Sequence, residues 1–202
     1  MHKNSYSKMK SFKMKYLDPN ENLEILDVGS LDYHGDFNYR SIFNEENWHY
    51  TGLDIEKGKN VDIVVTDIYN WFEIEDNSYD VIISGQFFEH LEFFWLTMIQ
   101  IERVLKPGGY ICIITPSAGP KHGGNMLNCY RFQEDGLKAL AKYVDFEVIY
   151  AEVDERSEVG PWFDGCLIAR KKSLNDNLNN NTIEKRMDNL EDKLDSILKS
   201  LK

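Results

Sequence analysis

Two acidic residues stand near the ends of short apolar runs in this chain. The run Leu23–Val28 carries Asp27 and is followed by Gly29, and the run Thr51–Ile55 carries Asp54. Both runs are typical of buried strands, and a glycine after a strand lets bare backbone approach a ligand. Cofactors bind at the carboxyl edge of an open α/β sheet, where a carboxylate on the second strand can hold ribose hydroxyls. The pattern therefore predicts a nucleoside-containing cofactor.

The loop after Gly29 argues against a dinucleotide. A pyrophosphate needs a run of glycines that leaves empty space at a helix amino terminus. Here the chain instead supplies side chains, which are Ser30, Leu31, Asp32, Tyr33 and His34. The loop therefore argues against nicotinamide and flavin dinucleotides and favours a cofactor without a pyrophosphate.

Apolar runs alternate with helical patterns along most of the chain. Strands separated by crossover helices imply a parallel α/β sheet, and the last two strands are expected to form an antiparallel hairpin at its edge. One apolar stripe predicts a long helix over 87–105, which Lys106-Pro-Gly-Gly109 ends, and a second helix is expected over 132–143. The expected strands are 24–28, 50–53, 62–66, 79–84, 110–115, 146–153 and 165–171.

Six short motifs in this order resemble the Rossmann-like (class I) S-adenosylmethionine-dependent methyltransferases, in particular the subset that acts on small molecules and carbohydrates. The resemblance covers roughly residues 23–171 and implies that family's seven-stranded sheet and its cofactor, S-adenosyl-L-methionine. The motifs are Ile-Leu-Asp-Val-Gly (25–29), Thr-Gly-Leu-Asp-Ile (51–55), Thr-Asp-Ile (66–68), Tyr-Asp-Val-Ile-Ile-Ser (79–84), Phe-Glu-His-Leu (88–91) and Leu-Lys-Pro-Gly-Gly (105–109).

The resemblance also implies roles for individual residues. Asp27 would face the amino-acid portion of the cofactor, and Asp54 would accept hydrogen bonds from the ribose hydroxyls. Asp67 and Ile68 would contact the adenine. The remaining expected cofactor residues are Gly29, Ser30, Ile55, Gly85 and Gln86. The first loop departs from the family pattern, because Leu31 and Tyr33 stand where further glycines are usual.

Two histidines are candidates for acting on the methyl acceptor, and no metal site is expected. His90 would sit at the start of the long helix, and His122 lies in the loop after the fifth strand. A hydroxyl acceptor benefits from a base or an orienting group, whereas an anionic phosphate oxygen does not. The plainer alternatives are a helix-start histidine bonded to backbone and a solvated loop residue.

The segment after His122 supplies the expected acceptor contacts. Pro116–His122 with Tyr130-Arg-Phe132 resembles a signature of the carbohydrate-linked subset, so Tyr130, Arg131 and the earlier Tyr33 are predicted to contact the acceptor. An arginine fork suits phosphate or carboxylate. The plainer alternative is an ion pair of Arg131 with Glu134 or Asp135.

Composition limits the possible functions. The 202 residues carry a net charge of −11, which argues against a protein that binds nucleic acid through its phosphates. Three scattered cysteines fit a reduced, cytoplasmic setting, and no stretch is apolar enough for a membrane span. The resulting hypothesis is O-methylation of a small acceptor, such as a sugar or a nucleotide-linked precursor of a bacterial surface glycan. The alternatives are methylation of nucleic acid or protein, and a non-catalytic assembly factor.

The chain is expected to have four parts. Residues 1–22 are lysine-rich and could form a lid, 23–172 form the methyltransferase domain, 173–181 a linker, and 182–202 a coiled-coil helix. In the last part, apolar residues step by 4, 3, 4, 3 and 4 positions, which is a heptad seam. So short a helix is marginal alone, and its partner is a second copy, the domain itself or another protein. Self-association into a homo-oligomer is the favoured hypothesis.

Deletion of Thr182–Lys202 is expected to lower the oligomeric state, because it removes the whole heptad seam. Light scattering on the full and shortened chains gives the two masses. Equal numbers of subunits in both chains would contradict self-association through this segment.

Overall fold

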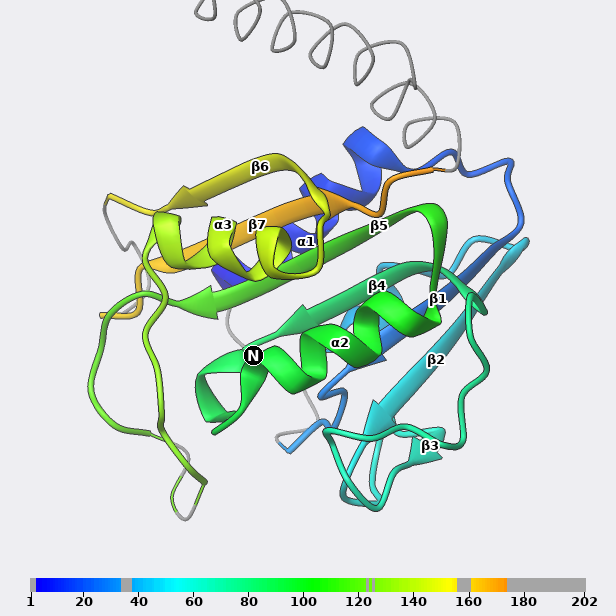
Figure 1. Ribbon diagram of the computed structural model, residues 1–202. Helices are drawn as coiled ribbons and strands as arrows, with labels where there is room; N and C mark the ends of the chain where they lie inside the picture. Colours follow the sequence, from blue (N-terminus) through cyan, green and yellow to red (C-terminus); the bar gives the residue numbers. More distant parts are fainter. Residues whose placement is uncertain (1–2, 34–37, 123, 125, 156–160, 174–202) are drawn as a thin grey trace, which may run out of the picture. The chain divides into compact units, whose positions relative to one another are not determined.

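The computed structural model describes residues 3–33, 38–122, 124, 126–155 and 161–173. The chain divides into two compact units, Met1–Lys171 and Lys172–Lys202. Seven strands of the first unit form one sheet in the order β3-β2-β1-β4-β5-β7-β6 (Figure 1). The strands are β1 (Leu23–Val28), β2 (Trp48–Asp54), β3 (Ile63–Val64), β4 (Tyr79–Gly85), β5 (Leu105–Pro116), β6 (Glu147–Val153) and β7 (Asp164–Arg170).

The strand directions confirm the expected architecture. Strands β3, β2, β1, β4 and β5 pair in parallel, so their carboxyl ends meet at one edge of the sheet. Strand β7 pairs antiparallel with both β5 and β6. The mostly parallel α/β sheet with an antiparallel edge hairpin is therefore confirmed. The main difference in strand length is at β5, which has twelve residues instead of the predicted six, and β3 has two instead of five.

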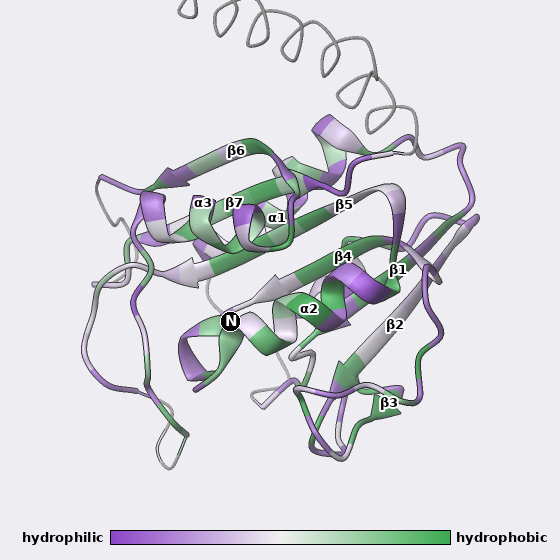
Figure 2. Cartoon of the chain, in the orientation of Figure 1, coloured by the Kyte–Doolittle hydropathy of each residue, from purple (hydrophilic) through white to green (hydrophobic). Residues whose placement is uncertain are grey.

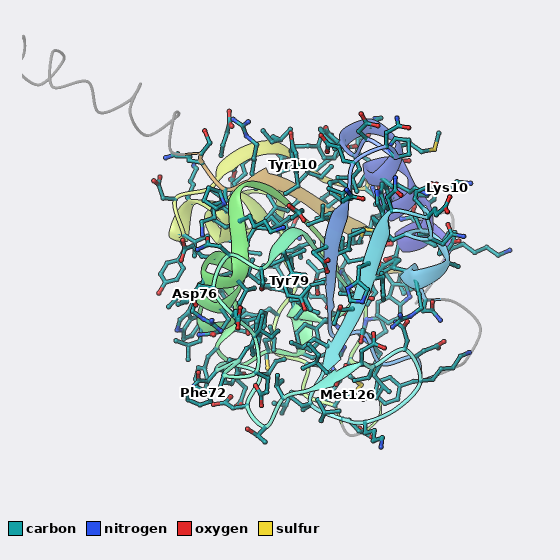
Figure 3. All side chains as sticks on the ribbon, turned by 90° about the vertical axis from the view of Figure 1, so that its right-hand side faces the viewer. Lys10, Phe72, Asp76, Tyr79, Tyr110 and Met126 are labelled. Atoms are coloured by element: carbon teal, nitrogen blue, oxygen red, sulfur yellow. The ribbon has the colours of Figure 1, made fainter. Side chains whose placement is uncertain are left out.

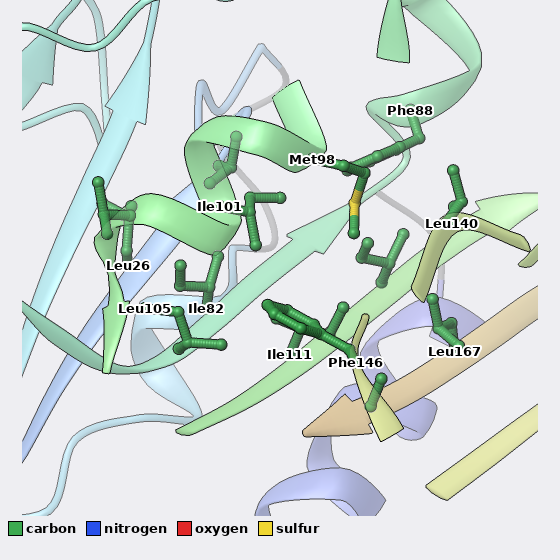
Figure 4. Close-up of a cluster of buried hydrophobic side chains, with 14 of the residues drawn as sticks. Leu26, Ile82, Phe88, Met98, Ile101, Leu105, Ile111, Leu140, Phe146 and Leu167 are labelled. Atoms are coloured by element: carbon green, nitrogen blue, oxygen red, sulfur yellow. The ribbon is translucent and has the colours of Figure 1, made fainter. Parts of the chain in front are cut away.

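Helices cover both faces of the sheet. Helices α2 (Phe94–Val104) and α3 (Glu134–Tyr143) lie on the face toward the viewer in Figure 1, and α1 (Lys3–Tyr16) lies behind. In Figure 4, Met98 and Ile101 of α2 point toward apolar side chains of the sheet. Strands β4, β5 and β7 carry long green stretches in Figure 2, as expected of strands in which most residues are buried.

The lysine-rich amino-terminal segment forms helix α1. Its Met9 and Phe12 are buried in a second apolar cluster, together with Ile25 of β1 and Val81 of β4. At its amino end, the Ser5 hydroxyl lies 2.6 Å from the hydroxyl of Tyr39. Tyr39 begins a short 3-10 helix, η1 (Tyr39–Ser41). The described residues thus place α1 on the sheet, and its role as a lid stays a prediction.

The prediction of a single long helix over 87–105 is wrong for residues 87–93. Residues Phe88–His90 form a separate 3-10 turn, η2, and α2 begins only at Phe94. The cause is tertiary hydrogen bonding, because the Glu89 carbonyl accepts from the amides of Cys129 and Tyr130 at 2.8 and 3.2 Å. His90 therefore lies in a turn that is fastened to a distant loop.

The predicted linker and the predicted coiled-coil helix lie almost entirely outside the described residues. Of the predicted linker at 173–181, Ser173 alone is described, and the predicted coiled-coil helix at 182–202 lies outside the described residues. Both stay predictions. Among the helices that the structure describes, none is long and apolar enough to cross a membrane.

Candidate active site

A cavity of about 1150 Å³ lies at the carboxyl ends of β1, β2 and β4. Figure 3 shows Met126, one of its lining residues, at the end of the molecule toward which β2 points. Most of the residues predicted from the sequence line this cavity, namely Asp27, Gly29, Ser30, Tyr33, Asp54, Ile55, Ile68, Gly85, Gln86, His90 and His122. Asp67, Tyr130 and Arg131 do not line it.

Asp27 is held in the wall of the cavity with little access to water. Its exposed fraction is 3%, and the hydroxyl of Tyr50 on β2 donates a hydrogen bond to its carboxylate. Burial raises the pKa of Asp27 to about 7, and the nearby charge of Asp54 adds to that rise. The Tyr50 bond and the Arg40 charge oppose it without cancelling it. A cationic ligand group would supply the missing compensation.

Asp54 ties two loops together at the tip of β2. Its carboxylate accepts the amides of Ile55 at 2.8 Å and Glu56 at 3.2 Å, and that of Leu31 at 3.1 Å. A carboxylate has roughly four lone-pair sites, so these three donors leave about one for a ligand hydroxyl. Burial raises the pKa of Asp54 despite these bonds. Asp54 therefore shapes the loop after β1 and keeps a limited capacity for a ribose.

The loops after β1 and β4 pack tightly against each other. Gly29 has a φ of +78°, and a β-carbon there would lie 2.3 Å from Cγ of Phe87. A glycine is needed for both reasons. Gln86 also has a positive φ, 58°, and its side-chain amide donates to Asp164 Oδ1 at 3.1 Å. Strained backbone of this kind concentrates at functional sites.

The two candidate histidines lie together, beside an acid that sequence reasoning passed over. The rings of His90 and His122 have centroids 5.1 Å apart. Oε1 of Glu89 lies 3.6 Å from Nε2 of His90 and 3.7 Å from Nε2 of His122. Glu89 is fully buried, which raises its pKa. The signal that could have found it is its place directly before His90, after the strand that ends at the cavity.

Arg131 and Asn128 brace the loop that carries His122. The Arg131 guanidinium donates to the carbonyls of Tyr130 at 2.7 Å and Pro120 at 2.8 Å. Asn128 accepts from the His122 amide at 3.1 Å and donates to the His122 carbonyl at 2.5 Å. The structure thus places Arg131 on loop carbonyls. Its prediction as an acceptor contact is not supported by its position.

Two further predicted residues take part in local structure. Tyr130 donates its hydroxyl to the Glu92 carbonyl at 2.9 Å and packs edge-on against Phe94. Asp67 is exposed, and its carboxylate accepts the Tyr69 amide at 2.8 Å in a tight turn. Its neighbour Ile68 is 9% exposed and lines the cavity. At this turn the apolar residue, and not the acid, faces the space where an adenine is expected.

The geometry agrees with what comparisons with known proteins show. Residues 34–113 match the family described as "Methyltransferase domain". A SAM-dependent methyltransferase from Methanosarcina mazei is similar in structure, with 18% identity, a TM-score of 0.58, and coverage of 79% of this chain and 96% of its own. A SAM-dependent methyltransferase from Aquifex aeolicus is also similar in structure, with 17% identity and a TM-score of 0.55. The match covers 84% of this chain and 98% of that protein. No curated protein sequence matches the chain.

A third solved structure has ligands in place. The 1,6-didemethyltoxoflavin-N1-methyltransferase of Burkholderia thailandensis, solved with 1,6-didemethyltoxoflavin and S-adenosylhomocysteine, gives 15% identity, a TM-score of 0.60, and coverage of 84% of this chain and 85% of its own. Residues 34–113 thus match a methyltransferase-domain family, and the chain has the Rossmann-like fold of the S-adenosylmethionine-dependent methyltransferases. Such low identities to solved structures show the fold alone, so they do not indicate which acceptor is methylated.

The residues of this methyltransferase cavity fit the cofactor. S-adenosylmethionine offers an ammonium, ribose hydroxyls and a flat adenine. In the cavity, the buried carboxylate of Asp27 could pair with the ammonium, and the carboxylate of Asp54 could accept a hydrogen bond from a ribose hydroxyl. The apolar side chain of Ile68 could pack against the adenine. The residues are thus complementary in chemical type to the three parts of the cofactor.

Replacing Asp27 by asparagine is expected to stabilise the cofactor-free protein at neutral pH. With a folded pKa of about 7 against 3.8 unfolded, Asp27 lowers the free energy of unfolding progressively as the pH rises from 3.8 to 7. The cost is complete above pH 7, on the order of 4 kcal/mol. Asp27→Asn should therefore gain most at pH 8 and less than half as much at pH 5.

Urea unfolding at both pH values measures this gain, and calorimetry with S-adenosylhomocysteine should show weaker binding to the same variant. A variant that is destabilised equally at pH 5 and pH 8 would contradict the raised pKa of Asp27.

Proposed function

We propose that this methyltransferase transfers the methyl group to a hydroxyl oxygen of a small acceptor, such as a sugar in a precursor of a bacterial surface glycan. The observation that carries the proposal is that one cavity contains both strand-tip acids and both histidines. Pockets for drug-sized ligands measure roughly 300–1,000 Å³. A cavity of about 1150 Å³ therefore leaves room for the cofactor and a small acceptor side by side.

In this proposal the cofactor lies along the tips of β1, β2 and β4. Asp27 faces its amino-acid portion, Asp54 receives a ribose hydroxyl, and Ile68 lies against the adenine. The remaining contacts come from Gly29, Ser30, Ile55, Gly85 and Gln86, all of which line the cavity. This placement leaves the end of the cavity near the histidines for the acceptor.

The histidine end suits a hydroxyl acceptor. S-adenosylmethionine carries its methyl group on a sulfonium and gives it to a nucleophile. A hydroxyl must lose its proton during that transfer, and His122 and His90 are placed to receive the proton or to orient the acceptor. Trp162, whose ring lies 4.6 Å from that of His122, and the exposed Tyr33 provide aromatic surfaces for a sugar ring.

The charge of the cavity favours a neutral acceptor. Its described lining residues include four carboxylates, Asp27, Asp32, Asp54 and Glu56, but neither lysine nor arginine. A phosphate-bearing acceptor would meet repulsion there. Of the two acceptors considered, this favours a sugar over a nucleotide-linked precursor, and it also counts against nucleic acid.

Asp54→Ala is expected to weaken S-adenosylhomocysteine binding by about 10- to 100-fold, because a hydrogen bond to a charged group contributes about 1.5–3 kcal/mol. The matched control is Asp76→Ala, since Asp76 is a surface residue paired with Arg103 at 2.7 Å. Calorimetry measures both affinities, and circular dichroism confirms folding. Unchanged affinity of the Asp54 variant would show that the ribose lies elsewhere.

A transfer assay with labelled methyl donor tests the acceptor class. Neutral sugars, sugar phosphates, nucleotide sugars and amines are compared at equal concentration, and the neutral sugars are expected to be methylated most. With the best acceptor, His122→Ala should lower kcat by about 100-fold or more. His49→Ala, at an exposed histidine outside the cavity, is the control. Transfer to amines alone would overturn O-methylation.

A further inference from the structure

Three metal-ligating side chains converge at the acceptor end of the cavity. Glu89 and His90 come from the turn η2 after β4, and His122 comes from the loop after β5. One ligand atom from each lies within 4.8 Å of the other two. Both histidines line the cavity, whereas Glu89 lies behind them.

The buried Glu89 carboxylate is only partly satisfied by its neighbours. Its Oε2 accepts a hydrogen bond from the Thr115 hydroxyl at 3.0 Å. Its Oε1 is buried and has no hydrogen-bond partner among the described residues. The two imidazole nitrogens nearest to it are 3.6 and 3.7 Å away, which is too far for a hydrogen bond. An uncompensated buried carboxylate is strongly unfavourable.

The tautomer of His90 indicates which kind of partner Oε1 of Glu89 lacks. Nδ1 of His90 contacts the Leu127 carbonyl, which can only accept a hydrogen bond, so Nδ1 carries the proton. With hydrogen on Nδ1, Nε2 is the ring nitrogen that can offer a lone pair, and it lies on the side of Oε1 of Glu89. A metal ion placed between these two atoms would bind both of them. A histidine whose N–H donates to a backbone carbonyl is also the usual arrangement in metal sites.

We propose that Glu89, His90 and His122 bind a divalent transition-metal ion such as Zn²⁺, with an open coordination position toward the cavity. Two ligand atoms each about 2.1 Å from a tetrahedral ion lie about 3.4 Å apart, close to the 3.6 and 3.7 Å found here. Two imidazoles and one carboxylate form a ligand set of open zinc and iron sites. Imidazole ligands favour such ions over Mg²⁺ and Ca²⁺.

One existing contact changes when the metal binds. Nη2 of Arg131 lies 3.5 Å from Nδ1 of His122, and both would carry hydrogen once Nε2 of His122 is a ligand. Arg131 keeps its shorter bond to the Pro120 carbonyl, at 2.8 Å, so this long contact can lengthen without releasing the loop. The metal site itself does not depend on the acceptor. With the metal bound, both Nε2 atoms are ligands and do not accept a proton, so the two histidines would orient an acceptor oxygen through the ion, a role that rests on the function proposed above.

The test is metal binding by the untagged, chelator-treated full chain. Calorimetric titration with Zn²⁺ is expected to show one site per chain. Co²⁺ should give the visible absorption bands of a tetrahedral ion. Glu89→Gln and His122→Asn should each weaken binding by at least about tenfold. His49→Asn is the matched control, because it removes an exposed histidine that also lies 2.8 Å from a glutamate, Glu24.

S-adenosylhomocysteine binding is measured on the same samples, so that the two proposals fail separately. Absence of a stoichiometric Zn²⁺ site in a wild-type chain that binds S-adenosylhomocysteine would overturn the metal site alone. Affinity for Zn²⁺ that Glu89→Gln leaves unchanged would also overturn it. If Glu89→Gln does not fold, as judged by circular dichroism, His122→Asn at the partly exposed position decides in the same way.

Discussion

Burial of carboxylates at the carboxyl edge of the sheet is the constraint on which this site depends. Asp27 is 3% exposed, Asp54 is 7% exposed and Glu89 is fully buried. A carboxylate removed from water has to be protonated, hydrogen-bonded or paired with a cation. Asp54 has three backbone donors, whereas Asp27 and Glu89 have fewer partners than their burial requires. This remaining demand for positive charge and for hydrogen-bond donors determines which ligands the cavity favours.

The parallel strands bury the carboxylates and also provide hydrogen-bond donors that partly compensate for this burial. Because β1, β2, β4 and β5 run in the same direction, their carboxyl ends bring the acids together and also bring a donor from a neighbouring strand to two of them. Tyr50 of β2 donates to Asp27, and Thr115 of β5 donates to Glu89. The raised pKa of Asp27 shows that such partial compensation lowers stability at neutral pH. Sites that bind and react commonly carry this cost.

The sheet and most of the residues at the strand tips that line the cavity could be predicted from the sequence, because buried parallel strands carry continuous apolar runs whose ends lie at one edge. The acceptor end could not. Glu89 becomes a candidate site residue only through its proximity to His122, which lies on a different loop. The break before α2 depends on amides of Cys129 and Tyr130, far along the chain, and no local pattern announces it. The acceptor contact of Arg131 stays a prediction that its position does not support, since loop carbonyls occupy its guanidinium.

The two ends of the cavity are therefore built differently. The proposed cofactor end is formed by strand tips, whose positions the hydrogen-bond register of the sheet determines. The proposed acceptor end is formed by the loops after β4 and β5, joined through the Glu89 carbonyl and through His90 with Leu127. Asn128 then fixes His122 within the second loop. Substitutions there can change which acceptor fits while the strand-tip acids stay in place, which gives a physical reason why proteins of this fold can share one cofactor and differ in their acceptors.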